Sequence, residues 1–315
     1  MIDRFSRLFV TAIFSLLLAA SPVLAAWPEK TVNILVHSSA GSSTDIMARA
    51  LAKGLEDVTG GTFVVTARGR EAMPALLNAP ADGYTLSTQT RSFLPELMQK
   101  QSPFNPEDFR WVAKLVGESY AFGVLVESDL KTFQDLIDQS RANPGEITMS
   151  TFSTGSMHQI SALLLNDAAG IDVNIVPYNS GSDLVVAMLG GNVDVAASNP
   201  SRLIQQVEAG ETRVLVVTSE ERNPNLPDTP TAVELGYGIV QAHWRGLIAK
   251  AGTPDDVLAE IDAALLQAIQ SQAFADYVTT EGLEVIYKGP DVLDAVVKQE
   301  MAEIKPRLEQ MDMLK

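Results

Sequence analysis

Short apolar runs alternate with segments of helical periodicity through most of this 315-residue chain. The runs are short enough to be single buried strands, and the segments between them repeat apolar residues at helical spacing. Alternation of strand and helix is typical of βαβ units, so we predict an α/β fold with mostly parallel sheets. The predicted strands are 33–37, 63–67, 84–89, 122–127, 147–152, 173–178, 193–198 and 214–219, and the predicted helices are 45–58, 132–141, 156–168, 182–189 and 201–208.

These elements are too many for one compact sheet, and the alternation starts again at FGVLVE (122–127) after DFRWVAKLVG (108–117), which looks helical. After residue 246 the chain has long helical patterns and few strands of its own, which favours a return to the first lobe. We therefore predict two α/β lobes with a ligand cleft between them. Lobe 1 consists of residues 26–123 and 247–315, and lobe 2 of residues 124–246.

Residues 1–25 have the order of features found in a cleavable signal peptide. Arg4 and Arg7 precede an apolar run, and small residues lead to VLA at 23–25. The alternative, a membrane anchor, is disfavoured because the run is shorter than the roughly 18 residues needed to span a bilayer. We predict cleavage before Ala26 and export to a bacterial-type periplasm.

Composition narrows the possible partners. The chain has no cysteine, so it has no disulfide framework and no thiol for lipid attachment. Its 23 basic and 39 acidic residues give a net charge of −16, which repels nucleic acid and anionic lipid. A small anion can still bind where N–H groups cluster, because exposed charges are screened beyond about 10 Å.

Two loops between a strand and a helix consist mainly of small and hydroxyl residues: HSSAGSSTD (37–45) and STFSTGSMH (150–158). In α/β folds ligands sit at the carboxyl ends of parallel strands, where such loops lead into helix N-termini. The unpaired N–H groups at a helix start favour an anion. One such turn alone is more often a helix cap. Because each predicted lobe has one such loop, the sequence favours a carboxylate site that the two loops share.

Enzyme motifs are missing from the sequence: it has no G-x-S-x-G elbow, H-E-x-x-H, P-loop or G-x-G-x-x-G. A nucleophile at Ser42, Ser43 or Ser156 would need a base and an orienting acid that the sequence does not locate. We predict a protein that is not an enzyme and has no cofactor and no metal. The alternative from another class is a secreted serine-dependent α/β hydrolase.

Short motifs follow one another in a distinctive order over nearly the whole chain. They are WPEK (27–30), GSSTD (41–45), ADGYT (81–85), NPG (143–145), VPY (176–178), GNVD (191–194), LPDTPT (226–231) and AGTP (251–254). Together with Ser156, His158, Trp244 and Gly246, their order and spacing resemble the periplasmic solute-binding receptors of tripartite tricarboxylate transporters, the Bug or TctC-like proteins.

The resemblance implies a type II-like periplasmic-binding-protein fold that closes on a small carboxylate and delivers it to the membrane subunits of a transporter. It implies that the two loops hold one carboxylate through backbone amides, hydroxyls and ordered water. Asp45 is expected to cap its helix and brace its loop, and His158 to orient its loop rather than titrate. The implied ligand-binding residues of the loops are Ser38, Ser39, Ala40, Gly41, Ser42, Ser43, Thr44 and Asp45, and Ser153, Thr154, Gly155, Ser156 and His158.

Three further candidates stand at strand ends, where they are expected to face the distal part of the ligand. They are Tyr178, Ser198 and Asn199, and loop packing is the alternative for each. Arg91, soon after the strand 84–89, is a candidate for binding a second carboxylate through its guanidinium. The alternative is a solvated or ion-paired surface arginine.

The chain also departs from the family pattern. Ser38 stands where relatives usually have an aromatic residue, and serines replace glycines after it, which suggests an atypical ligand. The stretch 66–78, at the rim of the first lobe, is shorter than usual and carries charged residues. The shape of this rim therefore cannot be inferred from relatives. The ligand stays open among a dicarboxylate, a tricarboxylate, an aromatic acid and an amino acid. We expect a monomeric receptor for a transporter, with a receptor for a two-component sensor kinase as the alternative.

Overall fold

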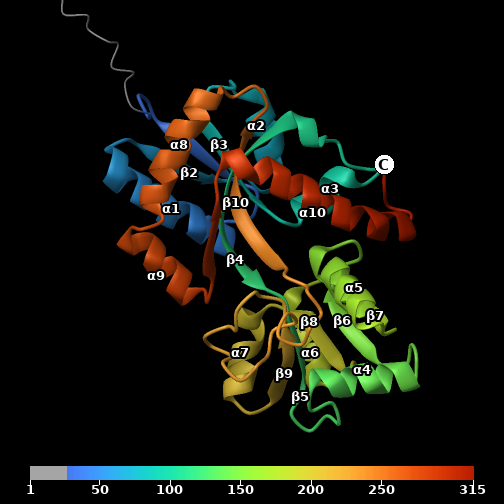
Figure 1. Ribbon diagram of the computed structural model, residues 1–315. Helices are drawn as coiled ribbons and strands as arrows, with labels where there is room; N and C mark the ends of the chain where they lie inside the picture. Colours follow the sequence, from blue (N-terminus) through green and yellow to red (C-terminus); the bar gives the residue numbers. More distant parts are fainter. Residues whose placement is uncertain (1–26) are drawn as a thin grey trace, which may run out of the picture.

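In the computed structural model of the protein, which describes residues 27–315, the chain forms two α/β lobes, each built on its own sheet (Figure 1). The predicted signal peptide, 1–25, lies outside the described residues. Between residues 27 and 315 no helix combines the length and the apolar character that crossing a membrane requires.

The first sheet has six strands in the order β11-β4-β10-β3-β1-β2 and is covered on both faces. One core cluster joins one face of the sheet to α1, α8 and α9, and a second joins the other face to α2, α3 and α10. The strands are β1 (Val32–Val36), β2 (Phe63–Ala67), β3 (Thr85–Thr90), β4 (Phe109–Ser119), β10 (Ala242–Lys250) and β11 (Glu284–Lys288). The helices are α1 (Ser43–Thr59), α2 (Ala72–Asn78), α3 (Phe93–Met98), α8 (Asp255–Ala268), α9 (Gln272–Thr280) and α10 (Pro290–Gln310).

The second sheet has five strands in the order β7-β6-β8-β5-β9. Its strands are β5 (Ala121–Leu125), β6 (Thr148–Phe152), β7 (Asn174–Tyr178), β8 (Val195–Ser198) and β9 (Thr212–Val217). Its helices are α4 (Phe133–Ala142), α5 (Met157–Ala169), α6 (Gly181–Leu189) and α7 (Pro200–Glu208). The predicted α/β fold with two lobes is confirmed.

The sheets are mixed, however, rather than mostly parallel. Parallel pairing is found where β1 lies between β2 and β3 and where β6 lies between β7 and β8. The strands that connect the lobes, β4, β5 and β10, pair antiparallel with their neighbours. The reason is topological: a chain that leaves a lobe along β4 and returns beside it along β10 must run in opposite directions.

The stretch 108–117, which looks helical in the sequence, is instead most of the long strand β4. Residues on both faces of β4 are buried, including the β-branched Val112 and Val116. A strand buried on both faces reads as a continuous apolar run and loses the alternation that identifies a half-exposed strand.

The two passages of the chain between the sheets are tied together by Thr218, which is fully buried. The first passage is Tyr120, the single residue between β4 and β5. The Thr218 N–H donates to the Tyr120 carbonyl (2.9 Å), and the Tyr120 N–H donates to the Thr218 hydroxyl (2.9 Å). That hydroxyl donates to the carbonyl of Gln241 (2.9 Å), whose N–H donates to the Thr218 carbonyl (2.8 Å). The limits of the lobes, predicted near 123 and 246, stay a prediction.

Candidate functional site

The first candidate loop joins β1 to α1 and is held by its own side chains. Ser42 is the N-cap of α1: its hydroxyl accepts from the Asp45 N–H (3.3 Å) and lies 2.7 Å from the Ser38 hydroxyl. The Gly41 N–H donates to Oδ2 of Asp45 (2.9 Å). The Arg49 guanidinium pairs with Asp45 (3.0 Å) and holds the pKa of that carboxyl below its usual range. Asp45 therefore braces the loop, whereas the helix cap is Ser42 and not Asp45.

The second candidate loop joins β6 to α5 and repeats this arrangement. Ser156 is the N-cap of α5, and its hydroxyl accepts from the Gln159 N–H (3.3 Å). The Gly155 N–H donates to Oε1 of Gln159 (2.7 Å), and the Ser156 hydroxyl donates to the Phe152 carbonyl (2.6 Å). The neutral Gln159 thus does in this lobe what the ionised Asp45 does in the other.

Both loops follow the pattern Ser-x-Gly-Ser-x-x-Asp/Gln, over residues 39–45 and 153–159. In each, the glycine has φ +76°, and the N–H of the second serine donates to the carbonyl of the first (3.2 and 3.1 Å). The N-cap serines also match, with φ/ψ of −70°/158° and −72°/159°. Two equivalent turns therefore present the first N–H groups of α1 and α5, which have no acceptor within the helix and favour an anion.

The two loops differ in what covers them. Ser39, Ala40 and Gly41 are exposed, whereas Gly155 is buried. A Cβ on Gly155 would lie 2.7 Å from Cε of Met313, near the C-terminus. The Met313 carbonyl accepts from the Lys100 N–H (3.0 Å), so this segment is anchored on the first lobe. The first lobe therefore reaches across to the loop of the second.

The β4–β5 passage and β10 place aromatic side chains beside the second loop. The rings of His158 and His243 are 5.6 Å apart, and the Tyr120 ring is 5.1 Å from His158 and 6.4 Å from His243. At the start of the first loop, Nδ1 of His37 lies 3.0 Å from the Thr88 hydroxyl.

These three histidines are neutral at pH 7. Burial lowers the pKa of His37 and of His158 to about 4, and that of His243 well below its ordinary 6.5. Within residues 27–315, no three His, Asp or Glu side chains are arranged to hold a metal ion. The histidines therefore contribute hydrogen-bonding groups rather than charge.

Asn199 fixes the orientation of His158. Its Oδ1 lies 2.8 Å from Nε2 of His158, and its Nδ2 donates to the Ser119 carbonyl (3.1 Å). Because Oδ1 is an acceptor, Nε2 carries the proton and Nδ1 of His158 is left as an acceptor. His158 is thus held in place at the β4–β5 passage, and its neutral ring fits the prediction that it orients rather than titrates.

Two charged residues on the connecting strands form a link between the lobes that the sequence analysis missed. Nη2 of Arg245, on β10, lies 3.4 Å from Oε1 of Glu118, on β4. Oε2 of Glu118 accepts from the hydroxyl of Ser201 (2.6 Å), in α7 of the second lobe. A signal was present in the sequence: AHWRG (242–246) and GESY (117–120) put polar residues into otherwise apolar strands.

Several buried polar atoms near this junction have no hydrogen-bond partner among the described residues. Such atoms are uncommon in folded proteins and cost about 1–3 kcal/mol each when left unsatisfied. They mark a polar region between the lobes that a polar ligand or water can satisfy. They include Arg91 Nη1, Ser119 Oγ, His158 Nδ1, Ser198 Oγ, His243 Nδ1 and Arg245 Nη1.

Arg91 is buried and ion-paired. Its Nε donates to Oε2 of Glu300 on α10 (2.9 Å), and that oxygen also accepts from the indole N–H of Trp244 (2.9 Å). Lys114 Nζ lies 3.4 Å from the other Glu300 oxygen. The contacts therefore match the ion-paired alternative for Arg91, although in the interior rather than on the surface.

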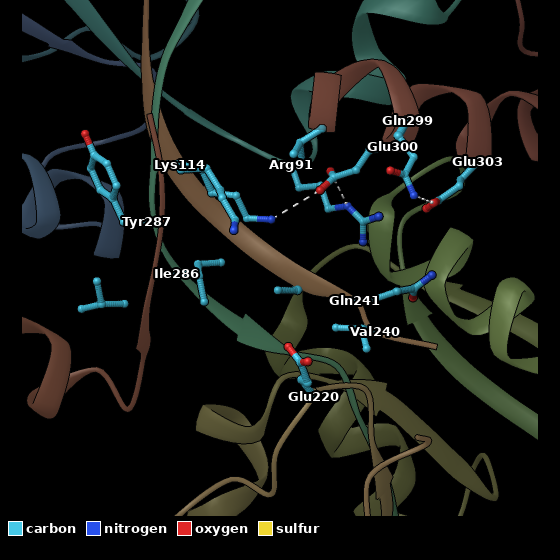
Figure 2. Close-up of a pocket in the computed structure, with 14 residues that line it drawn as sticks. Arg91, Lys114, Glu220, Val240, Gln241, Ile286, Tyr287, Gln299, Glu300 and Glu303 are labelled. Carbon is cyan, nitrogen blue, oxygen red and sulfur yellow. Dashed lines mark hydrogen bonds and ion pairs between the residues drawn. The ribbon is translucent and has the colours of Figure 1, made fainter. Parts of the chain in front are cut away.

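A pocket of about 470 Å³ lies next to this ion-pair cluster. Figure 2 shows the residues that line it. Arg91, Lys114 and Glu300 line it from the first lobe, and Glu220 and Val240 line it from the segment between β9 and β10. Of the predicted ligand-binding residues, Arg91 alone lines this pocket, so the pocket is distinct from the two loops.

The strand-end candidates are placed differently from one another. Ser198 is fully buried at the end of β8, which pairs with β5. Asn199 directly follows Ser198. Tyr178 ends the edge strand β7, pairs with Phe152 and packs against the second-lobe core. The structure thus brings Ser198 and Asn199 to the junction of the lobes and Tyr178 beside the base of the second loop.

Comparison with known proteins agrees with this architecture. The family described as Tripartite tricarboxylate transporter family receptor, TctC, matches residues 47–313. The chain belongs to this family. The protein BugT of Bordetella pertussis is 28% identical over 292 residues, which is 90% of each chain.

Two solved structures illustrate the shared fold. A TctC solute-binding protein from Polaromonas, without ligand, superposes with a TM-score of 0.81 at 20% identity, covering 90% of this chain and 100% of the other. The R. palustris protein Rpa4515 with adipate gives 0.72 at 25% identity, covering 91% and 99%. The family is one of receptors and not of enzymes, and Ser42 and Ser156 are helix N-caps.

Proposed function

We propose that this TctC-family protein captures a small organic carboxylate between its two lobes in the periplasm, as a monomer, and delivers it to the membrane subunits of a tripartite tricarboxylate transporter. The observation that carries the proposal is the pair of equivalent turns at the starts of α1 and α5, one in each lobe. Rpa4515, solved with adipate, supports the ligand class.

The geometry explains how a protein of net charge −16 can bind an anion. The positive ends of α1 and α5 and their free N–H groups act at short range, where the distant surface carboxylates are screened. Four or five charge-assisted hydrogen bonds of about 1.5–3 kcal/mol each would give roughly 6–15 kcal/mol. Association itself costs about 4–15 kcal/mol. We therefore propose that both loops engage one ligand as the lobes close.

Isothermal titration calorimetry of the mature chain against mono-, di- and tricarboxylates tests the ligand class. We expect saturable binding of one ligand per chain, with recovery of the ligand unchanged. Consumption of the ligand would support the hydrolase alternative, and the absence of binding across the panel would overturn the proposal.

A charge variant locates the binding to the loops. Ser39→Asp places a carboxylate on an exposed residue of the first loop, and we expect roughly tenfold weaker binding from like-charge repulsion. Thr132→Asp makes the same charge change at the N-cap of α4, which is no part of either loop, and should leave affinity unchanged. Equal effects of the two variants would contradict a site at the loops.

Delivery to a transporter needs a separate test. Uptake of the labelled ligand by cells that carry the membrane subunits should require the receptor. Normal uptake without the receptor, together with loss of a ligand-dependent transcriptional response, would instead support the sensor alternative.

A further inference from the structure

The strand alternation of the first sheet separates two buried arginines. Residues 243 and 245 of β10 point to one face, and Trp244 points to the other. Trp244 contacts Glu300 and so lies on the α10 face with Arg91. Arg245 pairs with Thr90 of β3. Thr90 lies on the same face of the sheet as Thr88, two residues earlier, and the Thr88 hydroxyl contacts His37. Arg245 therefore lies on the α1 face, where the first loop begins.

Two electrostatic effects agree with this placement of Arg245. Its charge contributes to the lowered pKa of His37, the residue that opens the loop, after the larger effect of burial. Burial raises the pKa of Tyr277, on α9, and both the charge of Arg245 and the nearby Ser43 hydroxyl act against this shift. Arg245 is thus close to residues that flank the loop on both sides.

The guanidinium of Arg245 is only partly satisfied. The residue is 9% exposed, its Nη1 has no partner among the described residues, and its contact with Glu118 is long, at 3.4 Å. Arg91 also has an unpartnered Nη1, but its Nε makes a shorter bond of 2.9 Å to Glu300, on the α10 face. Arg245 therefore has unused hydrogen-bonding capacity on the face that leads to the loops.

We propose that Arg245, and not Arg91, receives a second anionic group of the ligand, and that Glu118 sets how strongly it does so. The inference rests on the proposed function and adds the feature that selects the ligand. The two loops hold one carboxylate, and Arg245 favours ligands with a second carboxylate or a similar anion over those with one. Glu118 competes for the same guanidinium, and its bond to Ser201 couples that competition to the position of the second lobe.

Two variants that break the same ion pair distinguish this role from a structural one. Arg245→Gln removes the anion-binding group, and Glu118→Gln removes its competitor. The probes are adipate and hexanoate, which have equal chain length but two carboxylates and one. By calorimetry we expect Arg245→Gln to weaken adipate at least about tenfold, or about 1.4 kcal/mol, with little change for hexanoate. Glu118→Gln should bind adipate more tightly than the wild type.

Controls separate the possible failures. Arg245→Lys retains the charge without the planar fork and should restore part of the adipate affinity. Thermal unfolding checks that every variant is folded. If both glutamine variants weaken both probes alike, Arg245 is structural and the inference is overturned. A wild type that binds hexanoate as tightly as adipate also overturns it, whereas a wild type that binds no carboxylate overturns the proposed function as well.

Discussion

The loops 39–45 and 153–159 have the same backbone turn but different surroundings. The first is braced by the ionised Asp45, which pairs with Arg49, and its outer residues are exposed. The second is braced by the neutral Gln159 and covered by Met313 of the opposite lobe. Asp167 of α5, the helix that the second loop starts, forms an ion pair with Arg307 of α10. The turn itself is local, whereas its accessibility is set by contacts between the lobes.

Replacing the two bracing residues should give the largest difference between the loops. Gln159→Ala leaves the N–H of the buried Gly155 without a partner, which costs about 1–3 kcal/mol, and it also removes packing. Asp45→Ala should cost about 1 kcal/mol, because water can reach the exposed Gly41 and because Arg49 is half-exposed. Urea unfolding of both variants measures the two free energies. A larger loss for Asp45→Ala would show that the charge matters more than burial.

Replacing the two glycines should give a smaller difference. Both have φ +76°, so Gly41→Ala and Gly155→Ala should each lose about 1 kcal/mol from backbone strain. The new methyl group meets nothing at position 41 but displaces the flexible Met313 at position 155, so Gly155→Ala should lose about 1 kcal/mol more. Both glycine substitutions in a Met313→Ala background are the control. In that background they should lower the free energy of unfolding by the same amount.

Acid should distinguish the loops by the smallest amount. The pKa of Asp45 is lowered in the folded protein, so its stabilising contribution is present above the unfolded value of about 3.9 and is lost as pH falls through the folded value. Between pH 5 and pH 3 the free energy of unfolding should therefore fall less in Asp45→Asn than in the wild type, by under about 1 kcal/mol.

The lowered pKa values of His37 and His158 also affect stability in acid. Their neutral rings must be protonated on unfolding, so stability declines as pH falls below about 6.5. The histidines contribute equally to this decline in the wild type and in the Asp45 and Gln159 variants. Differences between these proteins in acid therefore report the contribution of the bracing residue alone. If Gln159→Ala reduced the fall in the free energy of unfolding between pH 5 and pH 3 as much as Asp45→Asn does, the fall could not be assigned to Asp45.

The sequence was informative where structure is set by neighbours along the chain. Hydroxyl residues ahead of an apolar helix predicted a helix start, and Ser42 and Ser156 are N-caps. The alternation of strand and helix predicted the two-lobed α/β fold. Local chemistry sufficed in these cases because a cap and its acceptor lie within three residues of each other.

The remaining features depend on register and long-range contacts, which a single sequence does not contain. Whether Arg91 or Arg245 faces the first loop depends on the side of the sheet to which each side chain points. A shift of one residue in a strand would reverse it. The cover that Met313 provides for Gly155 joins distant parts of the chain. The helical appearance of β4 arose because both of its faces are buried.

The hydrogen bonds that join Thr218 to Tyr120 and Gln241 have a consequence for how the gene could be divided. They hold Tyr120 and Gln241 next to one another, so the stretch between these residues begins and ends at nearly the same point. A gene fragment for this stretch could be excised and its product closed by a short glycine linker. The remaining coding sequence could be rejoined across the same point. In topological terms, the middle of the chain is inserted between β4 and β10, which are neighbours in the first sheet.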